Sequence, residues 1–250
     1  MKRKFIIGCF LCALLAAACT HRPKKITDAC GTPIVIDAAY DAQPDSLVSA
    51  IVAKYKEELN ERLYEVVGKS AREMSVRRPE SLLSNFTADA ILSVAKEKIR
   101  HDIDFSLINF GGIRTDMPSG DITVYDLYSI YPFENKLAIL TIDGKTVREL
   151  FDFFAANRME AMSNVYLYVN EKKVSEATIN GKPLDDNQTY TLVTLDFIAQ
   201  GGDGMNMLSK ASNYESTELL LRDVMEEYIR SYTAKGKMID SKIDGRIKIL

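Results

Sequence analysis

The stretch Asn109-Phe110-Gly111-Gly112-Ile113-Arg114 places two adjacent glycines and an arginine directly after a short apolar run, residues 104–109. That run has the length of a buried strand, and the glycine pair predicts a turn at its end. At such a turn the backbone can come close to a ligand, and its N–H groups can point at an anion. Arg114 adds a planar fork of donors for phosphate or ribose oxygens. Taken alone, the stretch is better explained by an ordinary turn and a surface ion-pairing arginine.

Two phenylalanines and an aspartate elsewhere in the chain strengthen the case for a ligand site. Phe133 follows Pro132, and Phe197 precedes the turn Gly201-Gly202-Asp203-Gly204. Phenylalanine is a core residue by default, but at the edge of an element it can present its ring over a pocket, where stacking contributes about 1–3 kcal/mol per base. Asp203, unless it only forms an Asx turn, can accept hydrogen bonds from ribose hydroxyls. Together these segments predict a site for a nucleotide or nucleoside.

The sequence contains two histidines, His21 and His101. A hydrolytic two-metal centre requires clustered histidine, aspartate and asparagine ligands, and so small a histidine set cannot supply them. The sequence also has no G-x-S-x-G nucleophile elbow and no G-x-x-x-x-G-K-[ST] phosphate loop. We therefore expect no catalytic residue, and no metal or other cofactor, in this chain.

The N-terminal residues indicate where the protein is located. Lys2, Arg3 and Lys4 precede an apolar run of 14 residues, Phe5–Ala18, and then Cys19. This arrangement is typical of a secretory signal, and the run is too short to span a bilayer as a helix. The small residues before Cys19 resemble a bacterial lipobox, so residues 1–18 are expected to be a lipoprotein signal peptide, Cys19 to be lipidated and residues 19–44 to be a tether. The protein would then be anchored in the bacterial cell envelope, on its periplasmic or cell-surface face. An ordinary cleaved signal with an incidental cysteine is the alternative.

The remaining residues, 45–250, are expected to form one domain. The formal net charge of −3 gives no electrostatic argument for binding a nucleic-acid polymer. Hydrophobic periodicity predicts helices over residues 46–68, 80–99, 123–130, 146–157 and 215–232, and strands over 104–109, 136–142, 165–169, 177–179, 190–195 and 245–250. Thr123 and Asp126 resemble a capping box at the start of the helix over residues 123–130. Because helices and strands alternate, with short turns such as Asn180-Gly181 between some strands, the expected fold class is α+β, mixed and layered.

The ordered motifs resemble the C-terminal, substrate-binding domain of the 5′-nucleotidase and UDP-sugar hydrolase family. The stretch from Asn109 to Arg114 is similar to its N-x-G-G-[IV]-R segment, Pro132–Asn135 to its P-F-x-N element and Phe197–Gly204 to its F-x-A-x-G-G-D-G segment. Residues 77–90 resemble its opening helix motif, with Ser84 in place of the usual glycine. The resemblance covers nearly all of residues 45–250 and implies a layered α/β/β/α domain.

The resemblance also implies a role for each site residue. Phe133 and Phe197 would sandwich the base, Asn109 would contact the base edge, Arg77 and Arg114 would bind ribose and phosphate oxygens, and Asp203 would bind ribose hydroxyls. Gly111, Gly112 and Gly202 complete the expected substrate-binding set.

In the family, a separate metallophosphoesterase domain holds two metal ions and the catalytic His-Asp pair, and nothing in this sequence replaces it. The leading hypothesis is therefore the nucleotide-binding half of a 5′-nucleotidase-type phosphoester hydrolase, acting in nucleotide catabolism. A separately encoded metallophosphoesterase chain would supply the divalent metals and the catalysis. A stand-alone nucleotide- or nucleoside-binding lipoprotein without hydrolase activity is the alternative, and a scaffold whose pocket has lost its ligand is a third.

Overall fold

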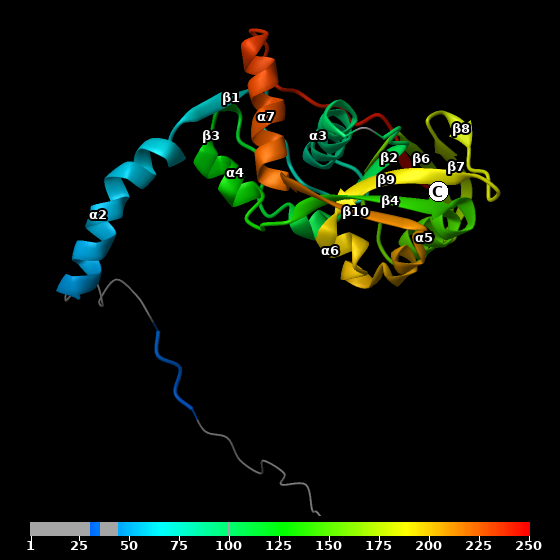
Figure 1. Ribbon diagram of the computed structural model, residues 1–250, viewed down its shortest axis with the longest axis horizontal. Coiled ribbons are helices and arrows are strands. Elements are labelled where there is room, and N and C mark those ends of the chain that lie inside the picture. The colour runs from blue at the N-terminus through cyan, green and yellow to red at the C-terminus, as the bar shows by residue number, and fades with distance from the viewer. Residues whose placement is uncertain (1–30, 36–44, 100) are drawn as a thin grey trace, which may run out of the picture. The chain divides into compact units, whose positions relative to one another are not determined.

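The computed structural model describes residues 31–35, 45–99 and 101–250 (Figure 1). The chain divides into two compact units, Met1–Val52 and Ala53–Leu250, and the domain below is the second of these. The predicted signal peptide over residues 1–18, Cys19, which is predicted to be lipidated, and most of the predicted tether lie outside the described residues. Within the described ranges, no helix combines the length and apolar character needed to cross a membrane.

Helices and strands alternate along the described chain. The helices are α2 Ser46–Leu63, α3 Leu82–Lys98, α4 Val124–Ile130, α5 Gly144–Ala156, α6 Asp196–Ala199 and α7 Leu221–Ala234, with short 3-10 turns η2 Phe110–Gly112, η3 Gly202–Gly204 and η4 Asn206–Lys210. The strands are β1 Val66–Ser70, β2 Phe105–Ile108, β3 Gly120–Thr123, β4 Lys136–Asp143, β5 Ala161–Ser163, β6 Val165–Asn170, β7 Lys173–Ile179, β8 Lys182–Pro183, β9 Thr189–Leu195, β10 Asn213–Leu220 and β11 Ile247–Ile249. The predicted mixed, layered class is confirmed.

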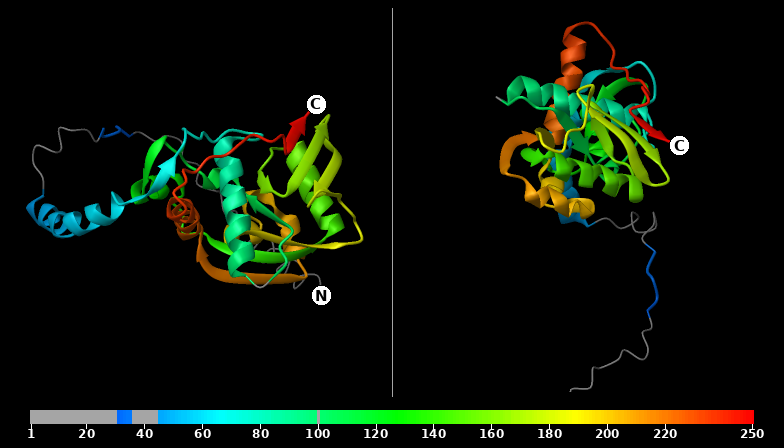
Figure 2. Two further views of the ribbon diagram at one scale, coloured as in Figure 1. Left: turned by 90° about the horizontal axis from the view of Figure 1, so that it is seen from above. Right: turned by 90° about the vertical axis from the view of Figure 1, so that its right-hand side faces the viewer.

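A five-stranded sheet in the order β10-β4-β9-β2-β5 forms the centre of the domain. β2 runs parallel to β9, and the other neighbours pair antiparallel. Adjacent residues of a strand point to opposite faces. On β2, Ser106 donates its hydroxyl to the Ala88 carbonyl of α3, whereas the ring of Phe105 lies 6.1 Å from that of Phe151 on α5. α3 and α5 therefore cover opposite faces of this sheet, with α7 beside α3 (Figures 1 and 2).

The C-terminal residues complete a second sheet, in the order β11-β6-β7-β8, where β11 runs parallel to β6. Arg246, just before β11, is buried and donates to Asp244 and to Asp89 of α3, each at 2.8 Å. The pKa of the Asp244 carboxyl is lowered, chiefly by its hydrogen bond from Arg246. This ion-paired cluster connects the closing strand to α3.

Two helices begin with a capping box, and one of the two was predicted from the sequence. Thr123 and Asp126 form the predicted capping box at the start of α4, each side chain bonding to the other residue's backbone N–H. A second capping box joins Ser81 and Ser84 at the start of α3. Ser84 is the residue that stands where the family usually has glycine, and its hydroxyl has a structural partner in Ser81.

The predicted helix over residues 46–68 is wrong at its C-terminal end. α2 ends at Leu63, and Val66–Ser70 forms β1, which pairs antiparallel with β3. Gly68 belongs to this strand rather than to a helix cap. A Cβ atom at residue 68 would lie 2.5 Å from Cγ2 of Ile229, so the glycine allows α7 to lie directly on β1. This contact joins residues far apart in sequence, and helical periodicity could not reveal it.

The predicted helix over residues 215–232 is also wrong at its start. Residues 213–220 form β10, the edge strand beside β4, and α7 begins only at Leu221. Polar residues fill the first part of this strand, and charged side chains such as Glu215 are typical of an exposed sheet edge. His101 lies exposed nearby, with its Nε2 atom 2.9 Å from Oε2 of Glu215.

Replacing Gly68 by alanine should destabilise the domain. The new methyl group would meet Ile229, and Oγ1 of Thr233 at 2.8 Å, so we expect a loss of about 1–3 kcal/mol in the free energy of unfolding from overpacking. Urea denaturation measures this loss. Gly31→Ala is the control, because no atom lies within 4 Å of a Cβ placed there. Equal stability of the two variants would contradict the packing described.

Candidate ligand-binding site

A cavity of about 510 Å³ lies at one edge of the five-stranded sheet. It is lined by Arg78, Asn109, Phe110, Gly111, Gly112, Arg114, Phe133, Asn135, Arg158, Phe197 and Asp203. Seven of the nine predicted substrate-binding residues are in this set. A cavity of similar size, about 540 Å³, is lined by residues of α3, α7 and the segment after α7 and contains none of the predicted residues. We therefore take the first as the candidate site.

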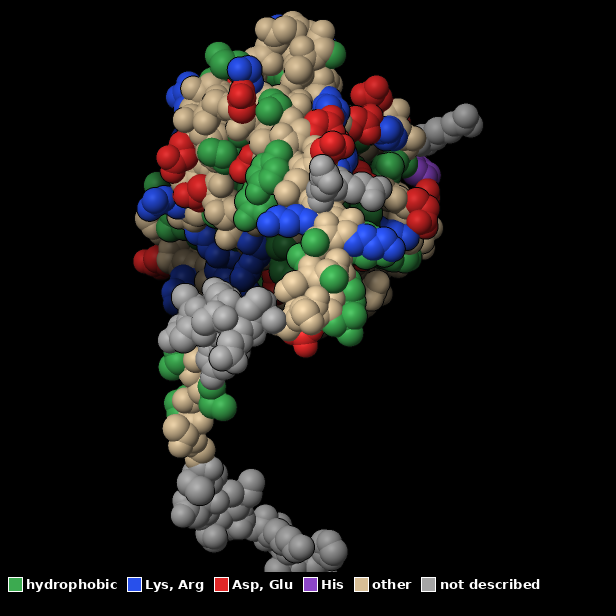
Figure 3. All heavy atoms as spheres, turned by 90° about the vertical axis from the view of Figure 1, so that its left-hand side faces the viewer, with side chains coloured by type: hydrophobic (Ala, Val, Ile, Leu, Met, Phe, Trp, Pro, Cys, Tyr) green, Lys and Arg blue, Asp and Glu red, His purple; other side chains and the backbone are tan. Residues whose placement is uncertain are grey.

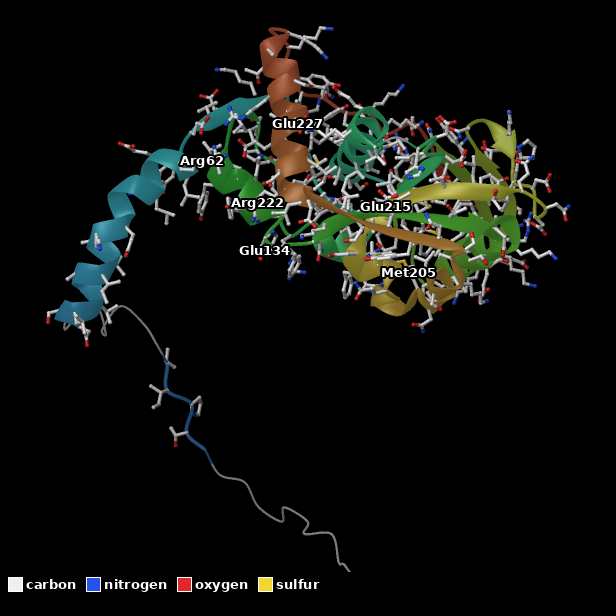
Figure 4. The ribbon with its side chains drawn as sticks, in the orientation of Figure 1. Arg62, Glu134, Met205, Glu215, Arg222 and Glu227 are labelled. Carbon is white, nitrogen blue, oxygen red and sulfur yellow. The ribbon has the colours of Figure 1, made fainter. Side chains whose placement is uncertain are left out.

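The sheet topology brings the lining segments together. β2 and β9 are parallel, so the turn that starts at Asn109 and the segment that starts at Asp196 leave the sheet at the same edge. β4 and β5 are antiparallel to their neighbours, so the segments before Lys136 and before Ala161 arrive at that edge as well. Segments distant in sequence thereby converge on one cavity. Figure 4 labels Glu134 and Met205, which adjoin the Phe133 segment and the turn after α6.

Asn109 is 5% exposed and occupies the space that the two glycines leave open. Its Nδ2 atom donates to Oδ2 of Asp203 at 2.6 Å. A Cβ atom at Gly112 would lie 2.9 Å from Oδ1 of Asn109, and one at Gly111 would lie 3.3 Å from Nδ2. The glycine pair thus accommodates the asparagine side chain, a reason that the sequence did not reveal. Oδ1 of Asn109 is the one buried side-chain polar atom without a partner among the described residues, and such atoms are destabilising and typical of functional sites.

Asp203 joins the two turns that face the cavity. Its backbone has a φ of 54°, in the left-handed region, which aspartate tolerates better than most residues. Because Asn109 occupies Oδ2, the other oxygen, Oδ1, is the one that can accept a hydroxyl. Oδ1 lies 4.0 Å from Nη2 of Arg158. The carboxylate therefore lines the cavity with an oxygen that accepts no hydrogen bond from the described residues, and a cation lies beside it.

The two predicted aromatic residues expose their rings instead of burying them. Phe133 is 46% exposed and Phe197 is 45% exposed, in a domain whose other large aromatic side chains include several that are fully buried. Gly202 does not line the cavity. A Cβ atom there would lie 2.5 Å from Cε1 of Phe197, so the glycine allows this ring to take its position. Arg114 lies beside Phe133, with its Cζ atom 5.9 Å from the ring centroid.

Arg78, and not the predicted Arg77, lines the cavity. Arg77 is exposed and lies outside the lining set. The guanidinium of Arg78 lies over the ring of Phe110, with Cζ 4.5 Å from the centroid, and its Nε atom donates to the Met159 carbonyl at 2.9 Å. These partners come from segments that follow β2 and α5, so the choice between two adjacent arginines depends on tertiary contacts.

Glu160 is a buried carboxylate behind the cavity that the sequence reasoning missed. It is 2% exposed, accepts the Phe110 backbone N–H at 2.6 Å and accepts from Nη2 of Arg78 at 3.0 Å. Burial raises the pKa of its carboxyl, although the Phe110 N–H, Arg78 and Arg158 act in the opposite direction. No sequence signal could have found Glu160, because it is a single acid between a helix and a short strand.

The charge of the site favours an anionic ligand. Three arginines, at 78, 114 and 158, line the cavity, whereas Asp203 is its one acidic lining residue and Glu160 lies behind it. By contrast, the face shown in Figure 3 carries Lys and Arg interspersed with Asp and Glu. Among the described residues, no group of three or more His, Cys, Asp or Glu side chains could hold a metal ion. What the described site can do is bind and orient a ligand that has a flat ring and negative charge.

The fold is a mixed α/β domain with several sheets and one candidate ligand cavity among the converging segments. A family profile described as "5′-nucleotidase, C-terminal domain" matches residues 51–210, and the chain belongs to this family. The membership confirms the resemblance inferred from the motifs.

Relatives of known name match over most of the chain. Protein UshA of Yersinia enterocolitica is 31% identical over 219 residues, covering 84% of this chain, and a 5′-nucleotidase of Vibrio cholerae is 25% identical over 83% of it. Among solved structures, a 5′-nucleotidase precursor from Thermus thermophilus has a TM-score of 0.69, with 25% identity over 84% of this chain. The matched part is only 39% of the UshA relative, 38% of the Vibrio protein and 45% of the Thermus chain.

The raised pKa of Glu160 predicts how the stability of Glu160→Gln depends on pH. Because its folded-state pKa lies above the usual 4.5, Glu160 binds more protons in the folded than in the unfolded chain between its unfolded and folded pKa, and its contribution to wild-type stability falls as pH rises through that window. Glutamine does not titrate. We therefore expect the unfolding free energy of Glu160→Gln, relative to wild type, to increase from pH 4 to pH 7. Urea denaturation at both values measures it, and a decrease would contradict the prediction.

Proposed function

We propose that this chain is the nucleotide-binding half of a 5′-nucleotidase-type phosphoester hydrolase that acts in nucleotide catabolism. The observation that carries the proposal is the presence of two half-exposed phenylalanine rings and three arginines around one cavity. Aromatic faces stack on bases, and guanidinium groups bind phosphate oxygens in a planar, bidentate geometry. Family membership and relatives named 5′-nucleotidase point to the same ligand class.

In this proposal each group of the cavity has a separate task. Phe133 and Phe197 stack on the base, and Asn109 lies at the base edge. Asp203 accepts hydrogen bonds from ribose hydroxyls through Oδ1, since Oδ2 already accepts from Asn109. Arg78 and Arg114 bind phosphate oxygens. The contribution of the chain to catalysis is then orientation and proximity, which lower the entropic part of the barrier without any reacting group on this chain.

We further propose that a metallophosphoesterase polypeptide supplies the divalent metals and the catalytic groups. The described residues bring no metal-binding cluster together, and the curated relatives are more than twice as long as their matched part. The N-terminal sequence supports a location in the bacterial cell envelope, with Cys19 lipidated and residues 19–44 as tether. Such an anchor would keep the chain and its partner in one compartment.

Loss of either aromatic ring should weaken nucleotide binding. We expect Phe197→Ala and Phe133→Ala each to reduce the affinity for AMP about 5- to 150-fold, the equivalent of about 1–3 kcal/mol of stacking. Isothermal titration calorimetry on the purified chain measures this. Tyr166→Ala is the matched control, because Tyr166 is a similarly exposed aromatic residue on β6 and outside the cavity. If wild type binds AMP and neither phenylalanine variant differs from Tyr166→Ala, the assigned base site is wrong.

The partner is tested by reconstitution. Mixing the chain with a metallophosphoesterase that lacks its own nucleotide-binding domain should raise the rate of phosphate release from AMP. Phe133→Ala and Phe197→Ala should remove most of that increase, because an unpositioned substrate loses proximity to the metals. Binding of AMP without any effect on turnover would favour the stand-alone binding lipoprotein instead. Failure of nucleotides to raise the melting temperature would favour a scaffold.

A further inference from the structure

Glu160 contacts three residues of the cavity without lining the cavity itself. Its Oε2 atom accepts the Phe110 N–H at 2.6 Å, and both carboxylate oxygens lie within 3.2 Å of Nη2 of Arg78. Oε1 also lies 3.6 Å from Nε of Arg158. Each of these three partners belongs to the cavity wall. The side chain of Glu160 is 2% exposed, so it reaches a ligand only through these neighbours.

Arg78 is held from three directions. Its Nε atom donates to the Met159 carbonyl, its Nη2 atom donates to Glu160, and its guanidinium plane lies on the Phe110 ring. Within the described part of the chain, Nη1 has no hydrogen-bond partner, so its two N–H groups are available to a ligand. An arginine held in this way loses less conformational freedom on binding than a mobile one, and preorganisation of this kind increases affinity.

We propose that Glu160 is the positioning residue of the phosphate-binding part of the cavity, and that it selects phosphorylated over unphosphorylated ligands by fixing Arg78 and the turn at Phe110. The inference rests on the proposed function and adds the residue that sets its preference for an anionic ligand. Glu160 touches neither base nor sugar. Its hydrogen bond with the Phe110 N–H requires only an oxygen acceptor, which glutamine also has, so the effect of the Glu160 charge acts through Arg78 on the ligand's anionic group.

Two effects of the carboxylate oppose each other. Its negative charge weakens the attraction of the cavity for phosphate, while its hydrogen bonds place Arg78 where phosphate can be bound. The side chain of Arg78 is 36% exposed, so without Glu160 it can turn toward water, where a surface charge pair is worth little. Positioning then outweighs the charge of Glu160. Tighter AMP binding on neutralising Glu160 would show the reverse order and overturn the proposal.

The test compares AMP with adenosine by calorimetry on the full chain. Glu160→Gln keeps the size of the side chain and an acceptor for the Phe110 N–H but removes the charge that holds Arg78. We expect about a tenfold loss of AMP affinity and less than a twofold change for adenosine. Glutamine has nearly the same size and shape as glutamate, and circular dichroism checks that the variant is folded.

A double-mutant cycle separates positioning from a general structural effect. If Glu160 acts through Arg78, adding Glu160→Gln to Arg78→Ala should cause no further loss of AMP affinity. Additive losses, or equal losses for AMP and adenosine, would overturn the proposal. Asp244→Asn is the control, because it neutralises another carboxylate that is paired with an arginine, Arg246, outside the cavity. This variant should leave the ratio of AMP affinity to adenosine affinity unchanged.

The design also covers the remaining outcomes. If circular dichroism shows Glu160→Gln to be unfolded, Glu160→Asp keeps the charge and shortens the reach to Arg78. The ratio of its affinity for AMP to its affinity for adenosine must then fall below that of wild type, and an unchanged ratio overturns the proposal. A wild-type chain that prefers AMP, together with a Glu160→Gln chain of the same preference, overturns this inference alone. A wild-type chain that binds neither ligand overturns the proposed function and this inference with it.

Discussion

β2 and β9 run parallel in the middle of the five-stranded sheet, so the chain leaves both strands at the same edge. Their antiparallel neighbours β4 and β5 begin at that edge. Four segments are therefore neighbours in space: the turn that carries Asn109, the segment with Phe133, the segment with Arg158 and the segment from Phe197 to Asp203. A reversed β2 would move the turn that carries Asn109 away from both aromatic rings, and a reversed β9 would move Phe197 away from that turn.

Polar contacts then hold these segments in place. The hydrogen bond from Asn109 to Asp203 connects the turn after β2 with the turn after α6, and Glu160 connects the turn after β2 with Arg78 and the start of β5. Each contact uses a buried or half-buried carboxylate, where a low local dielectric strengthens hydrogen bonds. The glycines have a related role, because they remove side chains where Asn109 and Phe197 pack. The carboxylates and glycines thus position the rings and arginines that line the cavity.

Local signals in the sequence were reliable where the interaction is itself local. The capping box of Thr123 and Asp126 lies where it was predicted, and Asn180 and Gly181 both have positive φ at the predicted turn. The errors came from contacts between distant segments. Residues 213–220 show little alternation of polar and apolar side chains, and they lie directly before α7. Only their pairing with β4 makes them a strand. The end of the first predicted helix is β1, which pairs with β3 and packs against α7 at Gly68.

The sequence by itself determined the family and the mixed fold class and predicted seven residues that line one cavity, because glycine turns, aromatic residues and arginines occur in an ordered series of motifs. The tertiary structure decided which side chains reach the cavity. Arg78, rather than Arg77, lines the cavity because it contacts Phe110 and Glu160. Gly202 packs against the ring of Phe197, and Asn109 donates to Asp203. The physical reason is that each of these contacts joins residues separated by a strand or helix. Periodicity and motif spacing indicate only interactions between residues that are close in sequence.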